Sequence, residues 1–204
     1  MGRIAGVSTA EIRDRLLRAA ADVFAEYGYD GTRVAEIAKA AGVSNAALYS
    51  HFGSKAELLV QALRERGPHL LAELLKADPD QPVGEVLLAA GRRLPQRRDG
   101  QRPLIVEALV AARRDRKVAR LMRAHLGERE TWLADLVRAG QLSGELDAAV
   151  SPQALAHFCL LLAMGSALVP NELCPVDARQ WEQLLRRLVN SLSPPEADVV
   201  KESR

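Results

Sequence analysis

The sequence predicts an all-α fold, and three observations indicate it. Alanine, leucine and arginine are abundant while aromatic residues make up only 4% of the chain, so helix formers outweigh strand formers. Apolar residues recur at the helical period, and no segment alternates in the manner of a strand. Capping residues, glycines and prolines divide this pattern into about nine helices.

The N-terminal quarter of the chain divides into three helices, the third of which ends near residue 51. A capping residue precedes each helix, because its side-chain oxygen can accept a hydrogen bond from a free amide in the first turn. A glycine follows each of the first two helices, as suits a left-handed stop. The caps are Ser8, Thr32 and Ser44, and the glycines are Gly28 and Gly42.

The rest of the chain contains the other helices. Ser54 and Glu57 have the spacing of a capping box, which opens the fourth helix. Gly67-Pro68 interrupts this helix, because proline lacks an amide hydrogen and clashes with the preceding turn. We expect it to resume over residues 70–76. Proline, glycine, aspartate and serine bound most of the later segments, which cover residues 82–95, 104–114, 115–140, 152–170 and 177–193.

The second and third helices flank Ala41-Gly42-Val43, where the glycine permits a sharp turn. Such a pair is a helix-turn-helix, the unit that lays its second helix in the major groove of DNA. A generic helix-turn-helix pattern is weakly specific by itself. The residues around this one carry more information.

The segment from Ala20 to Lys55 resembles the TetR family of transcription regulators, most specifically in the run Leu48 to Lys55 (LYSHFGSK). The resemblance implies a helix-turn-helix domain over residues 1–53, a helical ligand-binding and dimerisation domain over 54–195, and a disordered tail over 196–204. It also implies a dimer on operator DNA and a small-molecule effector. The other matching residues are Phe24, Gly28, Thr32, Ile37, Ala38 and Ala41 to Ser44.

The first turn of the third helix is the part expected to enter the groove. Ser44 and Asn45 can hydrogen-bond base edges or phosphate. Ala46 and Ala47 can touch thymine methyl groups or let the helix approach closely. Ser44 would also be an ordinary helix cap in any protein, so a contact with DNA would be a second role of this side chain.

Five further residues are predicted to contact the DNA backbone. Thr32 lies at a helix N-terminus, where its hydroxyl and the nearby amides can bind a phosphate, and Arg33 can reach the backbone beside it. Tyr49, His51 and Lys55 have polar tips suited to phosphate. Matching positions make such contacts in the resembled family. The alternatives are a purely structural cap at Thr32, a packed His51 and a solvated Lys55.

A two-fold dimer on a pseudo-palindrome is expected, because a monomer that reads a few base pairs would bind weakly. The residues up to Arg66 include nine basic and eight acidic side chains, so non-specific attraction to phosphates is modest. The eighth and ninth helices are expected to form a four-helix bundle with a second copy. The alternative makes the eighth helix the core of a monomer. The predicted interface residues are Leu155, Leu161, Leu162, Gly165, Trp181, Leu185 and Leu188.

The resemblance also implies a ligand pocket among the fourth to eighth helices, although most apolar residues there would suit an ordinary core. The basic stretch from Arg92 to Arg123 is either a solvated surface or a pocket mouth that attracts an anionic ligand such as an acyl-CoA. The predicted ligand-binding residues are Leu88, Leu109, Met122, His125, Trp132 and Phe158.

These features predict a ligand-responsive regulator, most simply a repressor that leaves its operator when a small, largely apolar effector binds. An activator is the open alternative. The effector would shift the population of two head arrangements, with Gly67-Pro68 as the pivot.

Other classes of protein find little support. The sequence has no glycine-rich phosphate loop, nucleophile elbow or triad, so neither an enzyme nor a cofactor is expected. The four histidines are scattered, which argues against a metal site. No signal peptide or long apolar stretch is present, so we expect a cytoplasmic protein without a membrane partner. A helical adaptor or ligand carrier with a vestigial helix-turn-helix is the remaining alternative.

Overall fold

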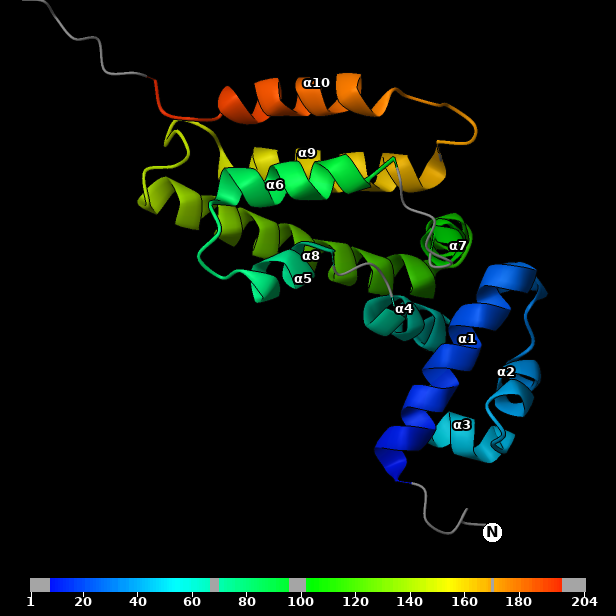
Figure 1. The fold of residues 1–204 in the computed structure, drawn as a ribbon. Helices are drawn as coiled ribbons and strands as arrows, with labels where there is room; N and C mark the ends of the chain where they lie inside the picture. The colour runs from blue at the N-terminus through cyan, green and yellow to red at the C-terminus, as the bar shows by residue number, and fades with distance from the viewer. Residues whose placement is uncertain (1–7, 67–69, 96–101, 170, 196–204) are drawn as a thin grey trace, which may run out of the picture. The chain divides into compact units, whose positions relative to one another are not determined.

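The computed structural model describes residues 8–66, 70–95, 102–169 and 171–195. The predicted all-α class is confirmed, because these residues contain ten helices and no strand (Figure 1). One helix more than expected arises because the predicted fourth helix appears as two elements, one on each side of residues 67–69. The predicted pivot at Gly67-Pro68 and the predicted tail lie outside the described residues.

The described chain packs as two compact units. The first unit holds α1 (Thr9–Gly31), α2 (Val34–Ala40), α3 (Asn45–His51), α4 (Lys55–Arg66), α7 (Arg102–Ala112) and the first part of α8 (Arg116–Leu142). The second unit holds α5 (Leu70–Ala77), α6 (Val83–Arg93), the rest of α8, α9 (Pro152–Leu168) and α10 (Ala178–Asn190). The predicted boundary between a DNA-binding and a ligand-binding domain after residue 53 stays a prediction. In the structure α4, which follows that boundary, packs closely on α1 in the first unit.

The first unit is built around α1, which packs on α2, α4 and α7. Apolar side chains spaced at the helical period bury one face of α1, and Phe24 at its centre is fully inaccessible. Leu48 and Phe52 are 0% and 1% exposed, so both side chains belong to the core of this unit. They attach α3 to this core, so its opposite face is left open.

Two glycines with positive φ shape the chain around α2. Gly42 has φ +69° directly after α2 and allows the turn into α3. Gly28 has φ +71° and interrupts the helical geometry of α1, but a last helical turn follows it as far as Gly31. The predicted end of the first helix is therefore a kink inside it. A Cβ at Gly28 would lie 3.0 Å from Glu107 Oε2, so a side chain there would displace this carboxylate in addition to straining the backbone.

The second unit packs α6 against α5 and α10, and Val83, Val137 and Leu146 form a small buried core within it. Ser151 and Asp177 cap α9 and α10, because their side chains accept backbone amide hydrogens of the first turn. In the described ranges, none of the helices is both long and apolar enough to span a membrane.

Candidate nucleic-acid interface

The turn between α2 and α3 is fixed by local hydrogen bonds. The Val43 amide donates to Ala38 O at 2.9 Å, which closes the end of α2. The Ser44 hydroxyl accepts from the Ala47 amide at 3.1 Å and caps α3. Because Ser44 uses only an acceptor lone pair here, its hydroxyl hydrogen is still available to a phosphate or a base.

One face of α3 is exposed and carries the predicted DNA contacts. Ser44, Asn45 and Ala46 are exposed, and Ala47 is half-buried. Tyr49 is 57% exposed, a large value for an aromatic side chain. An open face that combines small residues, an amide and a phenol suits close approach to the edges of bases. Contact of these residues with DNA stays a prediction.

Two of the residues predicted to contact the DNA backbone have hydrogen-bond partners within the chain. Thr32 is 3% exposed, and its hydroxyl donates to Gly28 O at 2.6 Å. The Lys55 ammonium donates to Tyr29 O at 2.7 Å and to Thr32 O at 3.1 Å, and it lies 4.5 Å from the centre of the Tyr29 ring. Both side chains hold the kinked end of α1 in place, and contact of either one with a DNA phosphate stays a prediction.

Two more of the five predicted contacts with the DNA backbone, Arg33 and His51, lie at the surface to different degrees. Arg33 is exposed at the start of α2, where its amide donates to the Glu36 carboxylate at 3.0 Å. His51 is half-buried at the end of α3, with its ring centre 6.3 Å from that of Phe52. A phosphate contact by either residue stays a prediction.

Tyr29 joins the end of α1 to α7 and α8 within the first unit. Its amide donates to Glu107 Oε2 at 3.1 Å, and its hydroxyl donates to Asp115 Oδ2 at 2.8 Å. The other oxygen of Asp115 accepts the amides of Lys117 and Val118, so Asp115 caps the long helix α8. Sequence reasoning missed the roles of Tyr29 and Glu107. Glu107 lies 78 residues after Tyr29 along the chain and Asp115 lies 86 residues after it, so no local pattern marks these contacts.

Hydrogen bonding and burial shift the pKa values of Tyr29 and Asp115 at this junction. The hydroxyl that Tyr29 donates lowers the pKa of Asp115, because it stabilises the carboxylate. Burial, together with the neighbouring Asp115 carboxylate, raises the pKa of Tyr29. The pair therefore holds a charged acceptor and a neutral donor over the whole physiological pH range.

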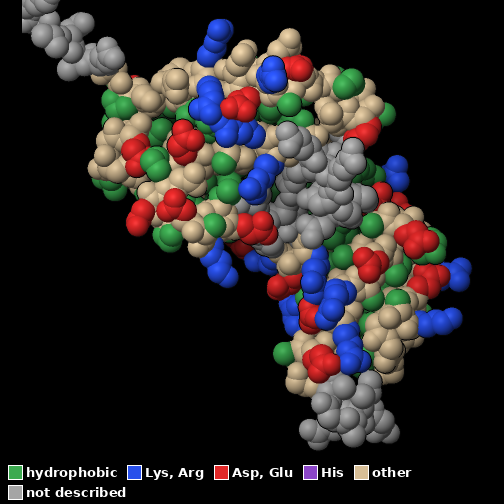
Figure 2. Space-filling view, viewed as in Figure 1, with side chains coloured by type: hydrophobic (Ala, Val, Ile, Leu, Met, Phe, Trp, Pro, Cys, Tyr) green, Lys and Arg blue, Asp and Glu red, His purple; other side chains and the backbone are tan. Residues whose placement is uncertain are grey.

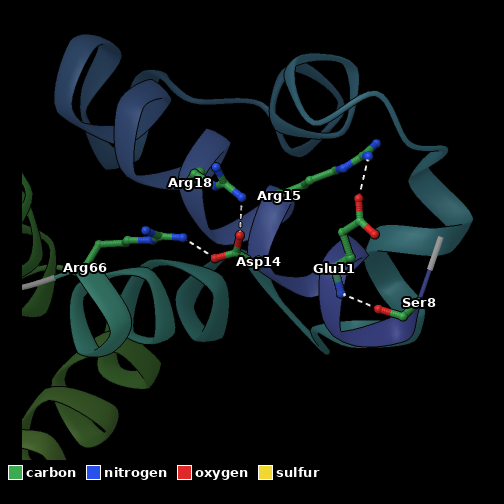
Figure 3. A network of polar contacts seen from close by, with 6 residues as sticks. All are labelled: Ser8, Glu11, Asp14, Arg15, Arg18 and Arg66. Carbon is green, nitrogen blue, oxygen red and sulfur yellow. Dashed lines mark hydrogen bonds and ion pairs between the residues drawn. The ribbon is translucent and has the colours of Figure 1, made fainter.

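Charged side chains on α1 are paired with one another, as Figure 3 shows. Arg15 lies 2.7 Å from Glu11, and Asp14 binds both Arg18 and Arg66, the last of these from α4. These exposed pairs each add little stability, but they compensate much of the basic charge of the head. On the face in Figure 2, acidic and basic side chains are interspersed, in line with the near-neutral head expected from the sequence.

Replacement of Lys55 by methionine should lower the free energy of unfolding by about 2–4 kcal/mol. The change removes two charge-assisted hydrogen bonds and a cation–π contact, and it leaves two carbonyls without that donor. Urea denaturation measures the effect, with the exposed Lys39→Met as the matched control. A lysine that served only as a phosphate ligand would give equal stabilities for the two variants.

Replacement of Tyr29 by phenylalanine should reduce the acid sensitivity of the fold. Asp115 has a lower pKa in the folded than in the unfolded chain, so its stabilisation is complete above the ordinary aspartate pKa of about 3.9 and is lost as pH falls through the folded value. The difference in melting temperature between the two proteins should therefore narrow from pH 5 to pH 3. A constant difference would contradict this role of the pair.

The predicted interface residues fall into three groups by exposure. Leu161, Gly165 and Leu188 are exposed, whereas Leu155, Leu162 and Trp181 are half-buried. Leu185 is 6% exposed, and its side chain packs on Gly91 of the same chain, so little of it is left for a partner. Further large apolar side chains on α9 and α10 are about half exposed, namely Phe158, Leu168 and Leu184.

The predicted ligand-binding residues are divided between the two units. Leu109, Met122 and His125 belong to α7 and α8 in the first unit, where Met122 and His125 are buried. Leu88 is buried in the second unit, whereas Trp132 and Phe158 are 42% and 52% exposed there. The exposed Phe158 shares a helix with the predicted interface residues, and a ligand contact for any of the six stays a prediction.

Comparison with known proteins agrees with this geometry. A family model for bacterial regulatory proteins of the tetR family matches residues 16–62, which span α1 to α4. The chain is 30% identical over 186 residues to the HTH-type transcriptional regulator TtgR of Pseudomonas putida, a match that covers 84% of this chain and 88% of TtgR.

Solved structures share most of this fold. GusR of Salmonella enterica superposes with a TM-score of 0.73 at 25% identity, covering 89% of this chain and 94% of GusR. A regulator from Saccharomonospora viridis in complex with choline has a TM-score of 0.65 at 22% identity, covering 89% and 96% of the two chains, and is evidence for the fold alone. An open α3 face on a helix-turn-helix, together with a relative matched over most of its length, gives one conclusion. The chain belongs to the TetR family and is a DNA-binding transcription regulator.

Proposed function

We propose that this protein represses transcription as a two-fold dimer on a pseudo-palindromic operator and is released by a small, largely apolar effector. The observation that carries the proposal is the exposed face of α3, with Asn45 and Tyr49 beside two alanines. The helix is anchored from behind by buried Leu48 and Phe52, so it can approach the groove as a rigid body.

The charge of the head supports a dimer. Non-specific affinity for DNA increases with the number of phosphates that a protein neutralises. Here the acidic partners Glu11 and Asp14 compensate Arg15, Arg18 and Arg66. A single head would therefore bind weakly, and two heads that dock together on matched half-sites supply the missing affinity.

An apolar strip on α9 and α10 supports a second copy as the partner in the dimer. The strip consists of large apolar side chains that are between 42% and 58% exposed in the single chain. Large apolar side chains exposed on two helices are typical of protein–protein contacts, and two helices from each copy make a four-helix bundle. The strip residues are Phe158, Leu161, Leu168, Leu184 and Leu188.

The junction at Tyr29 offers a route from the effector to the head. Glu107 and Asp115 hold the end of α1, and the predicted ligand residues Leu109 and Met122 lie on the same two helices, α7 and α8. A ligand that moved either helix would act on the support of α2 and α3. Its effect on DNA binding equals its differential affinity for the two arrangements.

A reporter assay tests the direction of regulation. The region upstream of the protein's own gene is fused to a reporter and measured with and without the protein. Repression predicts lower expression with the protein present and recovery when an effector is added. A rise in expression on addition of the protein would overturn the repressor mode and favour the activator.

A further inference from the structure

We propose that a cavity between α6 and α10 binds a compact anion attached to a flat apolar group, such as an aromatic carboxylate or an aryl phosphate. The cavity has a volume of about 350 Å³, at the small end of the range for ligand pockets. It lies entirely within the second unit. Its lining includes Arg92 and Arg93 from α6 and Arg179, Trp181 and Glu182 from α10.

Positive charge dominates the lining. Three guanidinium groups face one carboxylate, which leaves a net charge of +2 (three minus one). The carboxylate of Glu182 is itself shared, because it pairs with Arg92 at 2.9 Å and with Arg186 at 3.1 Å. Among the described residues, Arg93 and Arg179 take part in no ion pair and are exposed at the rim. Such a cluster recognises a carboxylate or phosphate, and two guanidinium groups can bind it from two sides.

Arg92 has donors that its own protein does not satisfy. Its Nε and one terminal nitrogen are inaccessible and have no hydrogen-bond acceptor within the described ranges. The contact with Glu182 brings opposite charges together without the alignment of a hydrogen bond. Buried donors of this kind are costly, and a ligand oxygen in the cavity would supply the missing acceptor after a small rotation of the side chain.

The start of α10 contributes to the site only indirectly. The Asp177 side chain accepts the amides of Arg179 and Gln180, so these groups of the first turn are already capped. The anion would therefore be held by side chains.

Trp181 gives the cavity a rigid flat wall. Its Nε1 donates to Gly91 O at 3.0 Å, which fixes the plane of the indole. The helices are in close contact there, because a Cβ at Gly91 would lie 3.0 Å from a methyl carbon of Leu185. A preorganised aromatic surface beside a guanidinium cluster favours ligands that combine a planar ring with a negative charge.

Isothermal titration calorimetry on the full chain without DNA tests the site. The probes are 1-naphthoate and 1-naphthyl phosphate, with neutral 1-naphthamide as the matched uncharged ligand. We expect saturable 1:1 binding of at least one anion and at least tenfold weaker binding of the amide. Equal binding of anion and amide, or no binding of either anion, would overturn the proposal.

Variants of the lining arginines test whether the anion binds in this cavity. The double variant Arg93→Gln/Arg179→Gln should weaken binding of the anion at least tenfold, while the control Arg187→Gln, an exposed arginine of α10 outside the lining, should leave it unchanged. Equal affinities of the two variants would contradict the assignment. Both changes are at exposed positions, so a thermal melt is expected to show intact folding.

This anion site does not depend on the proposed function, because binding of the anion is measured on the protein without DNA. A gel shift with added 1-naphthoate then asks whether an occupied cavity releases DNA. Loss of the DNA complex with the unmodified protein but not with the arginine double variant would identify the site as an effector site. Failure of the protein to bind operator would overturn the proposed function and leave the titration result unaffected.

Discussion

Replacement of Asn45 and Tyr49 together by alanine should weaken operator binding by about 100-fold or more without unfolding the protein. A good polar contact to a base edge, as expected of Asn45, contributes about 1–3 kcal/mol, the phosphate contact expected of Tyr49 adds to it, and a dimer loses each contact twice. Both side chains are exposed on the open face of α3, so their removal leaves the core intact. A gel shift on the upstream DNA measures the loss, and a thermal melt verifies the fold.

The exposed Arg120→Ala is a suitable control for this double variant. It removes a positive charge from the same unit at a position on α8, far from the α3 face in sequence. We expect it to change affinity by less than about threefold, as befits one non-specific charge. Full affinity in the Asn45/Tyr49 variant would mean that α3 does not read DNA, and a helical adaptor or carrier would then be the better interpretation.

Introduction of arginine at Leu161 and Leu188 should convert the dimer into a monomer. An apolar interface would have to bury four unpaired charges per dimer, at a cost of at least several kcal/mol, which raises the dissociation constant of the dimer by more than about 100-fold. Sedimentation velocity measures the mass. Operator binding should be lost with the dimer, because a single near-neutral head docks weakly.

Leu142→Arg provides the matched control for the interface. Leu142 is 90% exposed at the end of α8 and lies outside the strip on α9 and α10, so the same chemical change there should leave the dimer intact. A Leu161/Leu188 variant that remained dimeric would show that the apolar strip is not the interface. Dissociation of both variants to the same degree would point to a general effect of added charge.

Features that depend on neighbouring residues were predictable from the sequence. Ser8, Ser44, Ser151 and Asp177 cap their helices through bonds to amides within three residues, and Gly42 supplies the left-handed turn before α3. Such signals are local, because the acceptor and the amides it serves belong to the same turn. The order of the helices and the helix-turn-helix follow from them.

Contacts between distant segments were not predictable in the same way. Lys55 reads as a surface lysine because its acceptors are the backbone carbonyls of Tyr29 and Thr32, which no side-chain pattern marks. Leu185 has the spacing of an interface residue, yet Gly91 in another helix leaves room for it to pack inside the chain. In both cases the partner lies across the fold, so only the three-dimensional structure reveals the contact.

The arginine cavity illustrates the same limit. Arg92 and Arg93 begin the basic stretch that the sequence marks as a candidate for anionic ligands. Their partners Arg179 and Trp181 follow more than eighty residues later, at the start of α10. Composition could suggest an anion, but the packing of α6 on α10 is needed to gather the groups that would hold it.

The central claim is that two copies of the open α3 face read a two-fold DNA site, and selection of bound fragments from genomic DNA tests it most directly. The account predicts enrichment of inverted repeats whose half-sites are centred about one helical turn apart, with recovery lost for the Asn45/Tyr49 variant. Fragments without a shared repeat, or equal recovery with that variant, would contradict it.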